Sequence, residues 1–249
     1  MISMIDLSNK IILITGAGSG IGRETAIVAS KLGARVVMLD VSEGGLKETL
    51  AALSDAQHGY YVVDLSDTDT IGQTIKDIVD KYGAISGLVH CAGISSRKPL
   101  NVLKKDSFGK VMDVNFFAFV ELVKQVTRKD RFTEGGSIVV MSSISSIRGY
   151  KAKTEYCVSK AAVDAFVRCM SLELAPKRMR INSIMPGVVL TPMSVKSREM
   201  AEAAGSSIED APLGPTHPKE VANLIAFLLS DATKTITGTS ICIDGGLSV

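Results

Sequence analysis

The stretch Lys10-Ile-Ile-Leu-Ile-Thr15, followed directly by Gly16-Ala-Gly-Ser-Gly-Ile-Gly22, decides the fold of this chain. An apolar run of this length is typical of a buried strand, and the glycines after it predict a tight turn that opens a helix. In such a turn, backbone N–H groups and the positive end of the helix dipole can approach a pyrophosphate closely. We therefore expect a dinucleotide-binding turn whose contacts are Gly16, Ser19, Gly20, Ile21 and Gly22.

Outward from this segment, short apolar runs alternate with longer stretches of helical period. The alternation predicts parallel strands joined by crossover helices, and runs rich in Val and Ile suit strands covered on both faces. The expected fold class is α/β, a doubly wound Rossmann-type three-layer sandwich of about seven parallel strands. The expected strands are 10–15, 35–40, 59–64, 86–91, 136–142, 180–185 and 240–243, and the expected helices are 20–32, 43–53, 67–82, 105–130, 154–177 and 218–230.

Composition and charge narrow the class of protein. With 249 residues, 46% of them hydrophobic and 22% charged, we expect residues 1–249 to form one globular domain. A net charge of +2 without a basic block gives no support for nucleic acid or an anionic membrane as a partner, so small molecules are the expected partners. The four cysteines lack zinc-ligand spacing and no apolar run is long enough to span a membrane, so we expect no metal and a cytoplasmic location.

Acidic residues stand at the ends of two expected strands. Asp40 comes 18 residues after Gly22, where a carboxylate can accept hydrogen bonds from the adenosine ribose and would repel a 2′-phosphate. No cation follows it in the sequence, so NAD(H) is favoured over NADP(H). Asp64 could accept the adenine amino group, with the backbone of Leu65 as its neighbour, or could simply begin a turn.

A tyrosine and a lysine stand one helical turn apart. Tyr156 and Lys160 share a helix face, and a neighbouring ammonium can lower the pKa of a phenol from roughly 10 toward neutrality, where proton transfer is efficient. Such a pair is common on ordinary exposed helices, and its context favours chemistry here. Ser143, at the end of the expected strand 136–142, lies at the sheet edge where open α/β folds bind ligands, and its hydroxyl could hold a carbonyl oxygen.

One long irregular stretch interrupts the alternation, at about 187–217. It contains several prolines and a short helical piece from Met193 to Ala204. Because long loops in compact domains are usually functional, we expect it to be a mobile lid over a substrate pocket, the alternative being a plain surface insertion.

Taken together, these residues resemble the short-chain dehydrogenase/reductase family, in its single-domain branch, from about residue 8 to 247. The resemblance rests on the glycine-rich turn, on the order and spacing of the motifs, and on the residues that stand in them: Asp40, Asp64, Ala92-Gly93, Asn115, Ser143, Tyr156, Lys160, Pro186-Gly187, Thr191 and Asp244-Gly245-Gly246.

The resemblance implies a strand order of 3-2-1-4-5-6-7 and an NAD-dependent interconversion of a secondary alcohol and a ketone. It implies that Tyr156 is the general acid/base, that Lys160 lowers its pKa and binds the nicotinamide ribose, that Ser143 orients the substrate oxygen, and that Asn115 holds a water of a proton relay. It also implies that the cofactor contacts Ala92, Gly93, Pro186 and Gly187, and that the backbone of Val189 and the hydroxyl of Thr191 bind the carboxamide.

One departure from the family and several alternatives stay open. His90-Cys91 stands where the family usually has Asn-Asn, and we expect His90 to be an interior residue. The expected pocket wall, mostly neutral and apolar, includes Ser95, Ile144, Tyr150 and Met193, with no arginine placed for a carboxylate although Arg97, Arg148 and Arg198 are near in sequence.

The substrate and the assembly are the least determined. A 3-oxoacyl thioester, a steroid or bile-acid hydroxyl, a cyclic alcohol or a sugar-like polyol fits the resemblance. An NAD(P)-binding sensor or scaffold without turnover is the alternative. A homotetramer or homodimer is expected, and the apolar stripe Val163, Phe166, Val167 and Met170 suits either its interface or a core face.

Overall fold

The computed structural model describes residues 5–54, 57–203 and 211–249. Seven parallel strands form one sheet in the order β3-β2-β1-β4-β5-β6-β7, which confirms the expected topology. The strands are β1 (Ile11–Thr15), β2 (Arg35–Asp40), β3 (Gly59–Val62), β4 (Ile85–His90), β5 (Phe132–Met141), β6 (Arg180–Pro186) and β7 (Ser240–Ile243).

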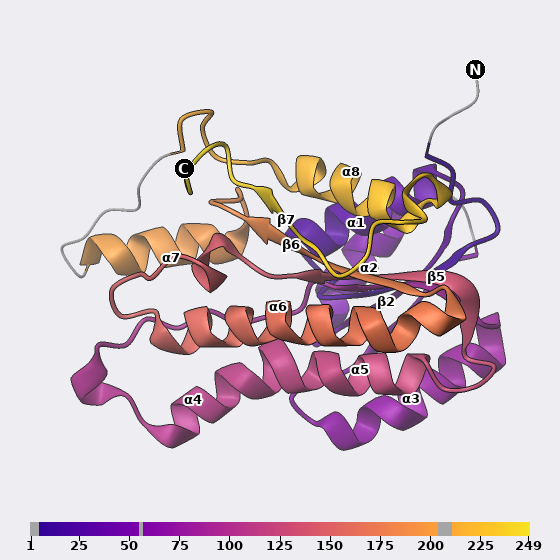
Figure 1. The fold of residues 1–249 in the computed structure, drawn as a ribbon, viewed down its shortest axis with the longest axis horizontal. Coiled ribbons are helices and arrows are strands. Elements are labelled where there is room, and N and C mark those ends of the chain that lie inside the picture. The colour runs from indigo at the N-terminus through magenta and orange to yellow at the C-terminus, as the bar shows by residue number, and fades with distance from the viewer. Residues whose placement is uncertain (1–4, 55–56, 204–210) are drawn as a thin grey trace.

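Helices cover both faces of this sheet, as Figure 1 shows with α1 and α8 above it and α3, α5 and α6 below. The α-helices are α1 (Gly20–Lys31), α2 (Glu43–Ala51), α3 (Thr68–Tyr82), α4 (Lys105–Met112), α5 (Ala118–Val126), α6 (Thr154–Leu174), α7 (Pro192–Ala203) and α8 (Pro218–Leu229). The result is the expected three-layer doubly wound sandwich.

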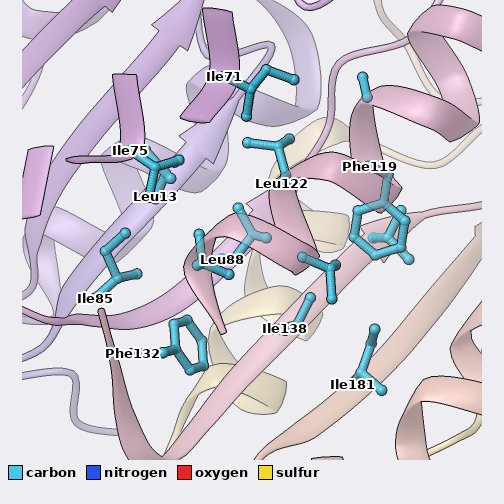
Figure 2. Packing of buried hydrophobic residues seen from close by; sticks show 14 of the residues in the cluster. Leu13, Ile71, Ile75, Ile85, Leu88, Phe119, Leu122, Phe132, Ile138 and Ile181 are labelled. Atoms are coloured by element: carbon cyan, nitrogen blue, oxygen red, sulfur yellow. The ribbon is translucent and has the colours of Figure 1, made fainter. Parts of the chain in front are cut away.

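Strand residues alternate between two apolar cores because successive side chains of a strand point to opposite faces. Leu13 and Leu88 face the helices α3, α5 and α6, whereas Ile12 and Val89 face α1 and α8. Figure 2 shows the first of these cores, in which Phe119 and Leu122 of α5 pack on the sheet. Burial on both faces explains why the strands read as unbroken apolar runs.

The expected helix 105–130 is interrupted. A π-helical turn, Asp113–Phe117, separates α4 from α5, and the amide of Ala118 donates to the carbonyl of Asp113, five residues earlier. Turns of this kind insert a residue into a helix and often lie at functional sites. Apolar periodicity cannot reveal one extra residue, so the sequence predicted a continuous helix.

Packing decides the role of the apolar stripe on α6, which the sequence left open between an interface and a core face. Val163 and Val167 are fully buried in the core that α6 shares with the sheet, and Phe166 and Met170 pack against the same core. The apolar stripe is therefore a core face.

In the described part of the chain, no helix is both long and apolar enough to cross a membrane.

Candidate active site

A cavity of about 760 Å³ lies along the carboxyl edge of the sheet, within the usual size range of ligand pockets. Residues from the glycine-rich turn, from the ends of five strands and from α6 and α7 line it. All the expected cofactor contacts line this cavity, and so do Ser143, Tyr156 and Lys160; Asn115 lies behind its wall, fully buried.

The glycine-rich turn is shaped by close backbone approaches. Gly16 has φ of +65°, and a Cβ there would lie 2.7 Å from the amide nitrogen of Ala92. A Cβ on Gly22 would lie 2.2 Å from the carbonyl oxygen of Gly16. Only glycine fits these positions, so the turn brings the amino end of α1 against the end of β1. Ser19, the N-cap, makes no side-chain cap, so α1 presents its first N–H groups at the cavity. These features fit the pyrophosphate of a dinucleotide.

Asp40 ends β2 beside this turn. Its carboxylate accepts hydrogen bonds from the amides of Gly18 and Ser42, both at 2.9 Å, which fixes it at the cavity wall. The tertiary structure also brings a cation near that the sequence did not reveal. Arg23 donates to the carbonyl of Gly18 at 2.5 Å, but its guanidinium pairs with Glu48 at 2.7 Å, and Arg23 is not among the described residues that line the cavity.

Asp64 follows β3 and begins a turn. One carboxylate oxygen accepts from both the amide and the hydroxyl of Ser66, at 2.9 and 2.7 Å, and these hydrogen bonds lower the pKa of Asp64. Asp64 therefore begins a turn, which was one of its two expected roles. Asp64 and Leu65 also line the cavity, and a contact between Asp64 and the adenine amino group stays a prediction.

Ser143, Tyr156 and Lys160 converge at the end of β5. The Ser143 hydroxyl accepts from the amide of Ser145 at 3.1 Å and lines the cavity together with Tyr156. The Lys160 ammonium lies 5.6 Å from the centroid of the Tyr156 ring and donates to the carbonyl of Met141 at 2.8 Å. A hydroxyl, a phenol and an ammonium thus meet in one cavity.

Burial governs the ionisation of this group. It raises the pKa of Tyr156, although the hydrogen bond with Ser143 lowers it in part. Burial also lowers the pKa of Lys160 to about 8, against the raising effect of Asp164. Desolvation of the phenol is the largest cause of the shift at Tyr156, and the expectation that Lys160 lowers the pKa of Tyr156 stays a prediction.

Asn115 occupies the π-helical turn and fastens two elements together. Its side-chain oxygen accepts from the amide of Ile94 at 2.8 Å, and its nitrogen donates to the carbonyl of Ile94 at 3.0 Å and to the hydroxyl of Ser159 at 3.0 Å. The amide therefore ties the segment after β4 to α6. A water held by Asn115 stays a prediction.

Asp164, one helical turn beyond Lys160, was not predicted as a site residue from the sequence. It is buried and accepts from the hydroxyls of Ser142 at 2.9 Å and Ser183 at 2.6 Å, so it joins β5, β6 and α6 beneath the cavity. Its spacing from Lys160 was the available signal, but the two serines lie far apart in the sequence.

Replacing Asp164 by Ala is expected to lower the free energy of unfolding by about 2 kcal/mol, because the two buried hydroxyls lose their common acceptor. Denaturant unfolding measures this change. Glu173→Ala, which removes an exposed carboxylate from the same helix, is the control. Equal unfolding free energies for the two variants would contradict the structural role of Asp164.

His90 is fully buried, as expected, and its Nδ1 lies 2.9 Å from the hydroxyl oxygen of Thr15. Burial, together with the charge of Lys160, lowers its pKa to about 3. The neighbouring Cys91 thiol has its pKa raised to about 12 by burial, so it is not a nucleophile at neutral pH.

The buried histidine predicts acid sensitivity. Between pH 6.5 and 3 the unfolded chain binds a proton at His90 that the folded chain does not, so stability is full above this range and falls as pH falls. From pH 7 to pH 5 the wild type is expected to lose about 2 kcal/mol more unfolding free energy than His90→Asn. Denaturant unfolding of both proteins at both pH values measures the difference, and equal losses would refute it.

The residues expected in the pocket wall are confirmed, but the expectation that the wall is neutral is wrong. Ser95, Ile144, Tyr150 and Met193 line the cavity. Arg97 and Arg148 line it too, and so does Lys153, because the segments after β4 and β5 fold back beside Tyr156. The sequence-based expectation of a neutral wall without a placed arginine is thus corrected.

The stretch 187–217 is described in part. Val188 and Val189 line the cavity, and Val189 forms a parallel bridge with Thr216. Met193, Ser194 and Ser197 of α7 line the cavity, so this helix covers it. Residues 204–210 lie outside the described residues, and the mobility of the lid stays a prediction.

Comparisons with known proteins agree with this geometry. A family model described as enoyl-(acyl carrier protein) reductase matches residues 16–248. The chain is 36% identical to the 3-oxoacyl-[acyl-carrier-protein] reductase of Thermotoga maritima, over 98% of this chain and 99% of that protein. It is 31% identical to an NAD-dependent glycerol dehydrogenase of Listeria innocua, over 98% and 96%.

Among solved structures, the chain is similar to a short-chain dehydrogenase/reductase, a glucose/ribitol dehydrogenase, from Brucella melitensis. The TM-score is 0.88 at 30% identity, covering 97% of this chain and 98% of that one.

Proposed function

This chain belongs to the short-chain dehydrogenase/reductase family and is an oxidoreductase of secondary alcohols and ketones; from these premises we propose that it uses NAD(H), with Tyr156 moving the proton. The observation that carries the proposal is the meeting of Ser143, Tyr156 and Lys160 in the cavity that the glycine-rich turn opens into.

Each of these side chains has a distinct task. The Ser143 hydroxyl and the Tyr156 phenol hold the substrate oxygen, which places the reacting carbon beside the nicotinamide position. Because burial raises its pKa, the phenol is protonated at neutral pH and can donate to the oxygen of a ketone as that oxygen gains charge. Lys160, anchored on the carbonyl of Met141, provides positive charge beside the phenol as it loses its proton.

The nicotinamide cofactor, when bound, accepts or delivers the hydride. The glycine-rich turn with Ser19 and Ile21 would hold its pyrophosphate, Asp40 its adenosine ribose and Asp64 with Leu65 its adenine. Ala92 and Gly93 would also contact the cofactor, whereas Pro186, Gly187, Val189 and Thr191 would hold its nicotinamide half, and Lys160 the nicotinamide ribose. The carboxylate of Asp40 at the wall, with Arg23 engaged by Glu48, supports NAD over NADP.

The test is a survey of ketones with NADH and of secondary alcohols with NAD⁺, followed by the absorbance of NADH. A 3-oxoacyl thioester belongs in this survey because the relative from Thermotoga maritima is named for one, and glycerol because the relative from Listeria innocua is named for it. Turnover of any member supports the proposal. Binding of NADH without turnover of any member would instead support the sensor alternative.

We also propose that the protein is a homodimer or homotetramer. With the stripe at Val163 and Val167 buried inside the chain, an interface on the same side would use the exposed Phe117, Val158 and Leu172 instead. Sedimentation equilibrium measures the assembly, and a monomer at micromolar concentration would refute it. The cytoplasmic location stays a prediction.

A further inference from the structure

The cavity has opposite charges at its two ends. The carboxylates among its described lining residues are Asp40, which ends β2, and Asp64, which follows β3. Arg97 follows β4, and Arg148 and Lys153 follow β5. In the sheet, β4 and β5 lie on the opposite side of β1 from β2 and β3. The acidic end is the one assigned to adenosine, so the cationic end is left to the substrate.

Among these three cations, Lys153 is the one placed beside the Tyr156 ring. It directly precedes α6, and its ammonium lies 5.7 Å from the centroid of the Tyr156 ring and 6.0 Å from that of Tyr150. The guanidinium carbon of Arg148 lies 5.6 Å from the centroid of the Tyr150 ring. Within the described residues, no ion pair joins Lys153 to a carboxylate.

The backbone holds Arg97 beside Lys153. The amide of Lys98 donates to the carbonyl of Ala152 at 2.7 Å, which joins the segment after β4 to the start of α6. The buried Glu155 strengthens this junction, because its carboxylate accepts from the hydroxyls of Ser96 and Ser107 and lies 3.7 Å from the Lys98 ammonium. Glu155 is therefore committed to the junction.

A half-buried ammonium that pairs with no carboxylate of the described residues is costly, and a second cation beside Lys153 adds to the cost. Burial lowers the pKa of Lys153, and the charge of Arg97 lowers it further. A bound anion would offset both effects. The cost is therefore expected to be recovered when a negatively charged ligand enters the cavity.

We propose that Lys153, with Arg97 beside it, binds an anionic group of the substrate, which is thus a secondary alcohol or ketone that carries a carboxylate or a phosphate. This inference rests on the proposed function for the reacting end of the substrate. Because the Lys153 ammonium lies 5.7 Å from the centroid of the Tyr156 ring, the anionic group lies near the reacting carbon in the substrate.

The first experiment compares charged substrates with their neutral counterparts. With NAD⁺, 3-hydroxybutanoate is paired with its methyl ester, and glycerol 3-phosphate with glycerol. The expected kcat/KM is at least about 10-fold higher for the charged member of one pair, and the pair that responds identifies carboxylate or phosphate. In Lys153→Met the preferred charged substrate is expected to lose about 10- to 100-fold, mainly through KM, while its neutral counterpart stays within about threefold.

Matched variants isolate the charge of Lys153. Lys153→Arg, which keeps the charge, is expected to retain the preference. Lys151→Met removes an exposed lysine two positions earlier, which is absent from the described cavity lining, and is expected to behave as the wild type. Equal losses on charged and neutral substrates in Lys153→Met, or no preference in the wild type, would overturn the inference.

A binding measurement separates this inference from the proposed function. Calorimetric titration of the NAD⁺-loaded protein with butanoate and with inorganic phosphate is expected to reveal binding of one of them, weakened at least about 10-fold in Lys153→Met. If no alcohol is oxidised and no ketone is reduced, the proposed function fails, while this loss still supports the anion site. If neither anion binds, or both bind Lys153→Met as tightly as the wild type, the anion site fails while turnover of a neutral substrate keeps the proposed function.

Discussion

Tyr156→Phe is expected to reduce kcat by about 10³-fold, because the variant keeps the ring and loses the proton that ketone reduction requires. Affinity for NADH is expected to stay within about threefold, since the turn, Asp40 and Lys160 are unchanged. Turnover is followed by NADH absorbance, and binding is measured by calorimetric titration with NADH.

Tyr60→Phe is the matched control, because Tyr60 packs against the core that the sheet shares with α1 and α8. Tyr60 is not among the described residues that line the cavity. It is expected to keep the wild-type rate. If Tyr156→Phe kept that rate as well, another group would have to supply the proton. A loss of NADH binding in Tyr156→Phe would show that the substitution disturbs the cavity itself.

Asp40→Asn is expected to reduce discrimination against NADPH by about 10²-fold. Gly18 and Ser42 donate to different oxygens of Asp40, so the amide keeps an acceptor for one of these two bonds, and it removes the charge that would repel a 2′-phosphate. Two unit charges about 4 Å apart interact by about 4 kcal/mol at a surface site, and screening at this half-buried position reduces the effect. The ratio of kcat/KM for NADH and NADPH measures it.

Glu43→Gln provides the comparison, since it also removes one negative charge near this end of the cavity. Glu43 is exposed, pairs with Lys47 at 2.8 Å and is not among the described lining residues. It is expected to leave the ratio unchanged. A wild type that binds NADPH more tightly than NADH would overturn the assignment of NAD, whatever the variants do.

Much of the fold was predictable because its determinants are local. The apolar run 11–15 and the glycines at 16 and 22 specify a strand, a turn and a helix within a dozen residues, and Asp40 marks the end of the next strand. The Tyr156–Lys160 pair is local too, since one helical turn fixes its spacing. For this reason the sequence predicted both ends of the cavity.

The features of the site that the sequence did not predict depend on residues that only packing brings together. Asn115 bonds to Ile94 and Ser159, and Asp164 bonds to Ser142 and Ser183, through contacts that no periodicity encodes. The extra residue of the π-helical turn and the burial that raises the pKa of Tyr156 are likewise consequences of the assembled layers.

The amino-acid sequence alone thus determined the order of strands and helices and the residue types at the site, because hydrophobic period, glycine geometry and helical spacing act over short distances. Only the tertiary structure decided which charges line the cavity. Arg97 and Lys153 lie 56 residues apart, and the hydrogen bond between Lys98 and Ala152, closed when β4 and β5 pair in the sheet, places them side by side.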